Sequence, residues 1–264
     1  MAALLRALHS GEFCFHYQGK FDTASLRLVG LEALLRWRQP GGAPAFPQQL
    51  VGMAEQSGAI VDLGNWGIAT ACRQLAQWRD AGLPLVPVAV NISVQQLSAP
   101  RLCDTVRHSL REHGLPAALL ELEVTESGQI GDMAQACAVL EQLRGLGVPG
   151  VPGVHIALDD YGTGYAGLHH VKTLPLDTVK IDRCFISDIA VDARDAVIVA
   201  STIALARSLG LTVLAEGVED GAQLEKLRSL GCQQVQGYYL HRPAPAAAIA
   251  ALLDRARAAP DDAM

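Results

Sequence analysis

The sequence predicts an α/β protein that folds as a closed (β/α)8 barrel. Three observations lead to this prediction: the chain has 264 residues, 50% of them are hydrophobic, and strand-like and helix-like apolar patterns alternate along it. Barrels of alternating strands and helices are typically about 250 residues long, and a chain of this size can bury one large core. A doubly wound open sheet is the alternative, because spacing alone does not exclude it.

The N-terminal segments predict a short helix followed by two strands. Residues 4–8 have helical spacing, and Ser10 and Gly11 end this helix. Alternating apolar patterns at residues 13–18 and 26–37 indicate the strands. The connection between them contains a short turn at residues 22–25, so the two strands can pair antiparallel.

Helical spacing begins at Pro47, and Gly82 and Pro84 end this region. Its two apolar faces consist of Leu50, Met53 and Ala54, and of Ile68, Ala71, Cys72, Leu75 and Trp78. Six further strands are predicted at residues 86–92, 119–124, 154–158, 178–181, 212–215 and 234–238. Six further helices are predicted at residues 94–113, 133–146, 165–173, 193–209, 221–230 and 245–258.

Two stretches interrupt this alternation. Residues 145–153 are rich in Gly and Pro and predict an exposed connector before the fifth strand. Residues 259–264 predict a frayed tail.

Composition narrows the class of protein. The net charge of −6 argues against binding a nucleic acid polymer, since that requires clustered basic residues. The six cysteines form no C-x-x-C pair, so we expect free thiols in a reducing compartment. Without a signal-peptide pattern or an apolar run of about 20 residues, we expect a cytoplasmic chain with no membrane contact.

Polar side chains with oxygen donors recur where the predicted strands end. Adjacent acids at one strand end often cap the next helix, but a repeated pattern indicates a shared cause. The set is Glu32, Asn91, Glu123, Asp159, Asp160 and Glu216. The C-terminal ends of parallel barrel strands converge on one mouth, so these side chains are expected to be neighbours there.

Five carboxylates gathered at one mouth must bind protons or divalent cations, because they repel each other. An all-oxygen set suits Mg²⁺ or Mn²⁺ better than Zn²⁺. Five acids and one amide are too many for one such ion, which indicates a site for two. Two-metal sites activate water against phosphodiesters, so the sequence predicts phosphoester hydrolysis.

Further polar residues have both a catalytic and a structural interpretation. Lys180 points into the barrel by strand alternation, where it positions a water or pairs with an acid. Gln236 holds such a water or satisfies a backbone group. Arg36 binds a substrate phosphate or forms a salt bridge at the rim. For Glu126 and Glu219 the pattern favours tying loops together or capping helices over binding metal.

Seven short motifs follow one another along the chain. They are Glu-Ala-Leu (32–34), Ala-Val-Asn-Ile-Ser (89–93), Glu-Leu-Glu-Val-Thr-Glu-Ser (121–127), Asp-Asp-Tyr-Gly-Thr-Gly-Tyr (159–165), Val-Lys-Ile-Asp-Arg (179–183), Ala-Glu-Gly-Val-Glu (215–219) and Gln-Gly-Tyr (236–238). With these motifs the chain resembles the EAL family of cyclic-di-GMP phosphodiesterases from about residue 13 to residue 245.

The resemblance implies a TIM-like barrel whose first strand is antiparallel, and hydrolysis of cyclic di-GMP to linear pGpG. It implies two Mg²⁺ or Mn²⁺ ions, held by the six residues at the strand ends with Asp159 as the bridge, and an inhibitory Ca²⁺. Lys180 and Gln236 would hold the nucleophilic water, with Lys180 or Glu216 accepting its proton.

The resemblance also assigns substrate contacts and a regulatory loop. Arg36 and Leu35 are expected to meet the phosphate and ribose, and Gln18 a guanine. A loop of Tyr161, Gly162, Thr163 and Gly164, anchored by Glu126, would couple the site to a homodimer interface. The chain departs from the family pattern at Gly19 in place of Pro, at Tyr161 in place of Phe, and in the longer connector 145–153.

We therefore expect a single EAL domain over residues 1–264, with a linker helix at residues 1–12. An N-terminal sensor or GGDEF cyclase domain in a longer parent chain is a further expectation. One alternative is a cyclic-di-GMP receptor or interaction module without turnover, although the chain retains all six proposed ligands. Another is a Mg²⁺-dependent barrel enzyme acting on a different phosphoester or on an enolisable acid.

Overall fold

The computed structural model describes residues 2–38, 47–125, 130–148, 150–164 and 167–258. One sheet closes on itself in the order β2-β3-β4-β5-β6-β7-β8-β1, with β1 also paired to β2. The strands are β1 (Phe13–Asp22), β2 (Leu28–Trp37), β3 (Val88–Ile92), β4 (Leu120–Thr125), β5 (His155–Tyr161), β6 (Thr178–Ile181), β7 (Thr212–Ala215) and β8 (Gln234–Val235). The barrel prediction is confirmed, and the open-sheet alternative is wrong.

Strand β1 runs against both of its neighbours. It pairs antiparallel with β2 and with β8, whereas the pairs from β2 to β8 are parallel. The short strand β9 (Ala244–Pro245) pairs antiparallel with the outer part of β1. The register sets Gln18 opposite Glu32 and Lys20 opposite Gly30, so side chains from β1 enter the barrel beside those of β2.

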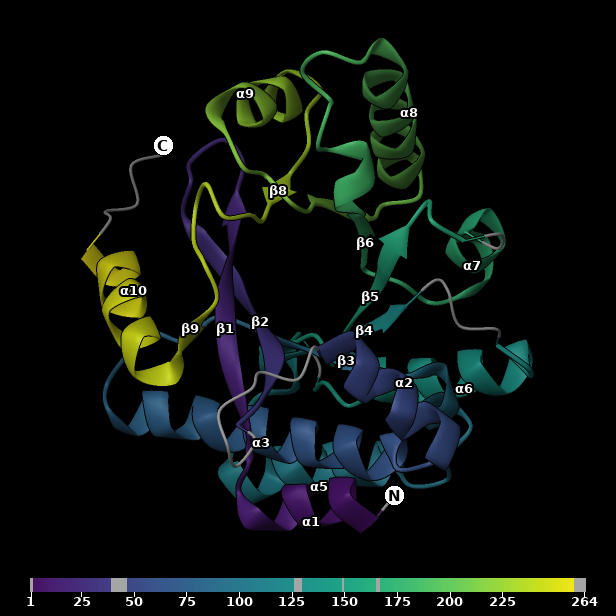
Figure 1. The fold of residues 1–264 in the computed structure, drawn as a ribbon, viewed down its shortest axis with the longest axis vertical. Helices are drawn as coiled ribbons and strands as arrows, with labels where there is room; N and C mark the ends of the chain where they lie inside the picture. Colours follow the sequence, from purple (N-terminus) through teal and green to yellow (C-terminus); the bar gives the residue numbers. More distant parts are fainter. Residues whose placement is uncertain (1, 39–46, 126–129, 149, 165–166, 259–264) are drawn as a thin grey trace.

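Helices surround the strands (Figure 1). They are α1 (Ala2–Ser10), α2 (Pro47–Ser57), α3 (Ile60–Asp80), α4 (Val94–Leu97), α5 (Leu102–His113), α6 (Met133–Arg144), α7 (Gly167–Thr173), α8 (Ala193–Ser208), α9 (Gly221–Ser229) and α10 (Ala246–Ala258), with 3-10 turns η1 (Ala117–Leu119) and η2 (Arg183–Phe185). The single helix predicted at residues 94–113 is wrong: the chain breaks between α4 and α5. Pro100 disfavours helical backbone at Ala99, which explains the break.

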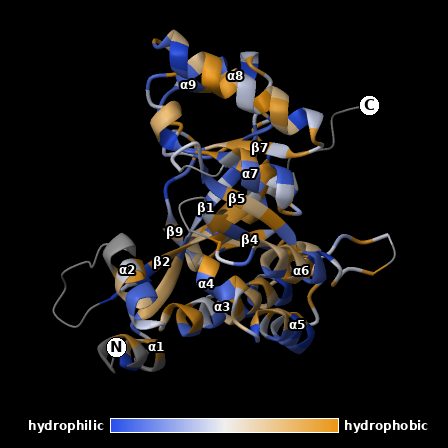
Figure 2. Cartoon of the chain, turned by 90° about the vertical axis from the view of Figure 1, so that its right-hand side faces the viewer, coloured by the Kyte–Doolittle hydropathy of each residue, from blue (hydrophilic) through white to orange (hydrophobic). Residues whose placement is uncertain are grey.

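The core lies between the strands and this helical layer, and Figure 2 shows hydrophobic residues along the central strands. The second predicted helical face is fully confirmed on α3, since Ile68, Ala71, Cys72, Leu75 and Trp78 are all buried. The first is only partly right, because Leu50 and Ala54 are buried but Met53 is 58% exposed. All six cysteines carry free thiols, as expected.

The Gly- and Pro-rich connector before β5 has Val148 and Val151 exposed, as predicted, and the two residues form an isolated bridge. The tail 259–264 lies outside the described residues. Within the described part of the chain, every helix is too short or too polar to cross a membrane.

Gly237 joins the loop after β8 to the loop after β7. The Val218 N–H donates to the Gln236 carbonyl at 3.1 Å, and the Val218 carbonyl accepts from the Tyr239 N–H at 3.0 Å. A Cβ on Gly237 would lie 2.0 Å from the Val218 carbonyl oxygen. Only glycine allows this approach, which holds Gln236 at the barrel mouth.

We expect Gly237→Ala to lower the free energy of unfolding by about 1–3 kcal/mol, because the added methyl forces the two loops apart. Chemical denaturation measures this loss. Gly131→Ala is the matched control, since a Cβ there meets nothing within 4 Å, and we expect a change within about 0.5 kcal/mol. Equal stabilities for the two variants would contradict the close approach.

Candidate metal centre

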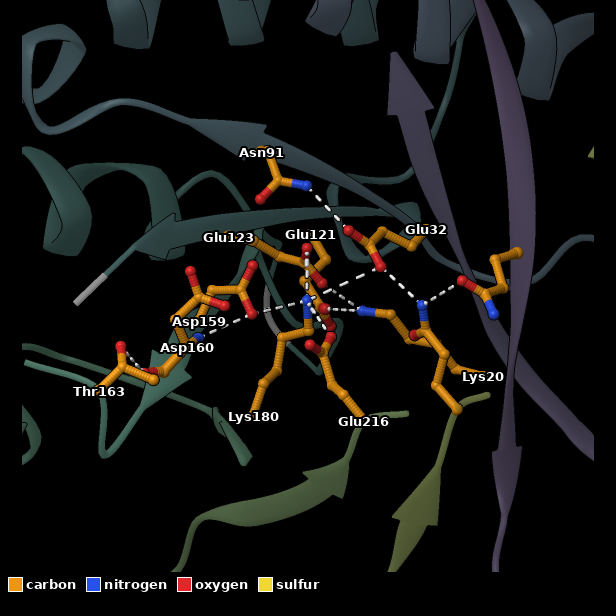
Figure 3. A network of polar contacts seen from close by, with 12 residues as sticks. Lys20, Glu32, Asn91, Glu121, Glu123, Asp159, Asp160, Thr163, Lys180 and Glu216 are labelled. Carbon is orange, nitrogen blue, oxygen red and sulfur yellow. Dashed lines mark hydrogen bonds and ion pairs between the residues drawn. The ribbon is translucent and has the colours of Figure 1, made fainter. Parts of the chain in front are cut away.

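Lys180 lies at the centre of a cluster of carboxylates inside the barrel (Figure 3). Its ammonium nitrogen is 2.7 Å from Glu216 Oε1, 2.9 Å from Glu123 Oε2 and 2.9 Å from Asp159 Oδ1. Glu32 Oε2 lies farther away, at 3.8 Å. Burial disfavours the charge on Lys180, but these carboxylates outweigh burial and raise its pKa well above the usual value.

Glu123, from β4, is fully buried and contacts two lysines. Lys20 donates to its Oε1 at 2.6 Å, and Lys180 donates to its Oε2 at 2.9 Å. Burial works to raise the pKa of Glu123, but Lys180 and Lys20 together lower it to about 2. Glu123 is therefore an anion at neutral pH.

Glu32, from β2, accepts two amide hydrogen bonds. Asn91 Nδ2 donates to its Oε1 at 2.9 Å, and Gln236 Nε2 donates to its Oε2 at 2.6 Å. Burial, and then the charge of Glu123, raise the pKa of Glu32 to about 7. The two amides thus orient a carboxyl group that binds a proton more readily than an ordinary Glu.

The adjacent acids Asp159 and Asp160 lie at the end of β5, where its pairing with β6 shifts register. Asp160 has a left-handed backbone with φ of 56°, which turns the two carboxyl groups in different directions. The Asp160 N–H donates to Asp159 Oδ1 at 2.9 Å. Burial, and then Asp159, raise the pKa of Asp160 to about 6. Glu216, after β7, has a pKa raised well above its usual value, chiefly by burial.

The carboxylates form two groups, and within each group the candidate ligand atoms all lie within 4.8 Å of one another. Glu32, Glu123 and Asp159 make one group, and Asp159, Asp160 and Glu216 make the other, so Asp159 belongs to both. The acids of this network, counting Glu121, number six against the two lysines Lys180 and Lys20, so the lysines do not balance them. Excess negative charge on oxygen donors fits hard divalent cations, so the clusters suit metal binding.

A cavity of about 570 Å³ opens beside the acids. Asn91 and Asp160 line it near the cluster, and Gln18, Leu35 and Arg36 line it farther along β1 and β2. Arg36 donates to the Leu35 carbonyl at 2.8 Å, and the buried Gln18 donates to the His241 carbonyl at 3.0 Å. The expected substrate residues therefore share one cavity with two of the expected ligands.

The loop after Asp160 turns tightly. The Thr163 N–H and hydroxyl both donate to the Asp160 carbonyl, at 3.2 Å and 2.9 Å. A Cβ on Gly162, which has φ of 99°, would lie 2.6 Å from the Phe185 ring. Tyr161 is the last residue of β5 and Gly164 follows in the loop, while Glu126 lies outside the described residues.

Glu219 is exposed in the loop before α9. Its backbone N–H donates to Gln223 Oε1 at 2.6 Å, which ties this loop to the first turn of α9. The contacts of Glu219 therefore favour a role in tying the loop to the helix over a role as a metal ligand.

Lys20 and Glu121 received no role from the sequence alone. Lys20 contacts Glu121 Oε1 at 2.5 Å and Glu123 Oε1 at 2.6 Å, and its side chain is 5% exposed. The available signal was alternation along β1, because Lys20 lies two residues after Gln18 and shares its face. This pattern alone does not identify a buried lysine, because a lone lysine in a strand usually faces solvent.

A family model described as EAL domain matches residues 1–243. The bifunctional diguanylate cyclase/cyclic di-GMP phosphodiesterase MucR of Pseudomonas aeruginosa is 43% identical over 243 residues, which are 92% of this chain and 35% of that protein. The cyclic di-GMP phosphodiesterase NbdA of the same organism is 42% identical over 246 residues, covering 93% of this chain and 31% of NbdA. The chain thus spans about a third of the length of these relatives.

Solved structures show the same fold. The PaMucR phosphodiesterase in complex with c-di-GMP superposes with a TM-score of 0.85 at 42% identity, covering 94% of this chain and 98% of that one. The EAL enzyme Bd1971 in its cAMP-bound form gives a TM-score of 0.86 at 29% identity, covering 96% of this chain and 69% of the other.

The raised pKa of Asp160 makes the metal-free protein sensitive to pH. Its carboxyl binds a proton more tightly when folded than when unfolded, so stability falls as pH rises from about 4 to about 6 and the penalty stays constant above that. We expect Asp160→Asn to remove this penalty, since Asn tolerates left-handed backbone. After solvent screening of this half-buried group, the gain at pH 8 is about 1 kcal/mol, or roughly 2–4 °C in Tm.

Thermal unfolding in EDTA at pH 4.5 and pH 8 measures this effect. The gain should be small at pH 4.5 and full at pH 8. A variant with an unchanged or lower Tm at pH 8 would show that the Asp160 charge does not destabilise the metal-free fold.

Proposed function

Because this chain belongs to the EAL domain family, we propose that it is a metal-dependent phosphodiesterase that hydrolyses cyclic di-GMP to linear pGpG. The observation that carries the proposal is the pair of carboxylate groups that share Asp159 beside a 570 Å³ cavity. A centre for two cations next to a cavity of this size suits a phosphodiester carried by a large ligand.

We propose that Mg²⁺ or Mn²⁺ occupies both groups, and that Ca²⁺ binds there without supporting turnover. The proposed ligands are Glu32, Asn91, Glu123, Asp159, Asp160 and Glu216, with Asp159 bridging. The side-chain amide nitrogen of Asn91 donates a hydrogen bond to Glu32, which leaves the amide oxygen available to coordinate a cation. Such ions, when bound, lower the pKa of a water and stabilise charge on the attacking and leaving oxygens.

Lys180 and Gln236 are proposed to orient the attacking water. Lys180 supplies a fixed positive charge beside Asp159 and Glu216. Gln236 Oε1 is buried and has no hydrogen-bond partner among the described residues, so it can accept a hydrogen bond from that water. Its Nε2 is already held by Glu32 and Gln18, which sets the direction of the free oxygen.

Hydrolysis forms a bond between the water oxygen and phosphorus and breaks the bond from phosphorus to one ribose 3′ oxygen. The water loses a proton, and the leaving oxygen gains one. Lys180 already donates to carboxylates, so we assign the proton from the water to Glu216, whose Oε1 lies 2.7 Å from Lys180. Arg36, with Leu35, is proposed to bind a phosphate and ribose, and Gln18 a guanine.

A homodimer is proposed through the face formed by α7 and the start of α8. Leu168, Val191, Val197 and Ile198 expose large apolar side chains there, between 42% and 84% exposed. The loop of Tyr161 to Gly164 precedes α7, and Gly162 packs against Phe185 just before α8. The contact between Gly162 and Phe185 supports the predicted coupling of the metal centre to the interface. Glu126 is proposed to anchor the loop of Tyr161 to Gly164. A further N-terminal domain stays a prediction.

The alternative function is a cyclic-di-GMP receptor without turnover. The two overlapping carboxylate groups favour the enzyme, because a receptor has no need for a second cation group. Incubation with cyclic di-GMP and Mn²⁺ separates the two, since the enzyme yields pGpG and the receptor gives saturable binding without product. A barrel enzyme for another phosphoester would leave cyclic di-GMP intact.

We expect Glu32→Ala to lower turnover of cyclic di-GMP with Mn²⁺ by more than about 10²-fold, because one cation group loses a ligand. Product chromatography measures the rate, and circular dichroism verifies the fold. Glu219→Ala is the matched control: an exposed acid whose loss should change the rate by less than about twofold. Near-normal turnover by Glu32→Ala would contradict the metal assignment.

We expect Val197→Asp to convert the proposed dimer into monomers, because burying a charge in an apolar interface is costly. Sedimentation velocity should show the mass falling by half. Leu209→Asp, an exposed residue at the far end of α8, is the control and should leave the dimer intact. A wild-type protein that sediments as a monomer would exclude the interface.

A further inference from the structure

We propose that Lys20 is a positioning residue for Glu123, and that it commits one oxygen of this carboxylate to the barrel floor so that the other faces the metal centre. This inference rests on the proposed metal-dependent function. It assigns a role to a buried lysine of β1 that neither the mechanism above nor the sequence motifs include.

The geometry divides the two oxygens of Glu123 between two lysines. Lys20 Nζ lies 2.6 Å from Oε1, and Lys180 Nζ lies 2.9 Å from Oε2. Lys20 belongs to the antiparallel strand β1, where it pairs with Gly30, two register positions deeper in the barrel than Gln18 and Glu32. Lys20 therefore reaches Glu123 from the floor of the barrel.

Only one oxygen of Glu123 is left for the centre. Glu123 Oε2 contacts Lys180, which also contacts Asp159 Oδ1 and Glu216 Oε1. The other oxygen of Glu123, its Oε1, is held by Lys20. Glu123 is also the one acid of its cation group whose side chain has no exposed surface, so bulk solvent does not reach Oε1, which Lys20 holds instead.

Glu121 explains how the positive charge of Lys20 can lie beneath a site that must attract metal cations. It contacts Lys20 at 2.5 Å, and its side chain is 12% exposed. The Lys20 and Glu121 charges cancel, so Glu123 gains a strong hydrogen-bond donor without a net positive charge being added to the floor.

A purely structural ion pair is the competing explanation. A buried pair is often no more stable than apolar residues of similar volume, so stability alone is a weak reason for a lysine here. Lys20 could also be satisfied by Glu121 without reaching Glu123. Lys20 also contacts Glu123, a proposed metal ligand. A positioning role explains this second contact, because groups behind a metal ligand commonly set its orientation.

A polar cavity of about 170 Å³ lies next to Lys20, Gly30 and Glu121 on the floor side. This space can accept the larger guanidinium of Lys20→Arg, which retains the charge and the donors. The chain thus offers a conservative variant as well as a charge-balanced one, Lys20→Met with Glu121→Gln, which removes the anchor and leaves the net charge unchanged.

The experiment measures the dissociation constant for Mn²⁺ by isothermal titration in the wild type, Glu121→Gln, Lys20→Arg and the double variant. We expect the double variant to bind at least about tenfold more weakly, as for other changes behind a metal ligand. Lys20→Arg should stay within about threefold of the wild type, and Glu121→Gln, which leaves the Lys20 charge uncancelled, should weaken binding less than the double variant does. In cyclic-di-GMP hydrolysis at saturating Mn²⁺, kcat of the double variant should fall while KM stays constant, because the substrate cavity is untouched.

A double variant that binds Mn²⁺ within threefold of the wild type overturns the proposal, as does a loss in Glu121→Gln equal to that of the double variant. If circular dichroism shows the double variant unfolded, Lys20→Gln replaces it under the same thresholds. A wild type that binds no Mn²⁺ refutes the proposed function itself, which keeps the two failures distinct.

Discussion

The concentration of negative charge inside the barrel is the constraint on which the rest of this structure depends. Six carboxyl groups and two lysines share one network, and most of these side chains have little access to water (Figure 3). Charges of the same sign interact strongly in such a medium, so each acid must find a cation, a hydrogen-bond donor or a proton. The lysine ion pairs, the amide contacts of Glu32 and the raised pKa values are three responses to this one requirement.

The antiparallel strand β1 determines how these responses are distributed. Because it runs against β2 and β8, its side chains enter the barrel in the reverse order along the axis. Gln18 reaches the mouth beside Gln236, and Lys20 reaches the floor beneath Glu123. One strand therefore contributes both to the proposed substrate cavity and to the support of a proposed metal ligand.

Much of the centre could be predicted from the sequence, for a physical reason. Parallel strands bring their C-terminal ends to one mouth, so Glu32, Glu123 and Glu216 had to meet once the barrel closed. Lys20 could not be identified in the same way. Alternation puts it on the inner face of β1, but its ion pair with Glu123 depends on a register that is visible only in the paired sheet.

The sequence by itself determined the barrel class, the alternation of elements and the set of acids, because hydrophobic periodicity and strand-end polarity are local properties of the chain. Tertiary structure decided the rest: the break between α4 and α5, the exposure of Met53, the sharing of Asp159 between two carboxylate groups, and the different pKa shifts of chemically identical acids. Those outcomes depend on which side chains meet across the barrel and how much water reaches them. Neither distance nor solvent access is encoded in any single stretch of residues.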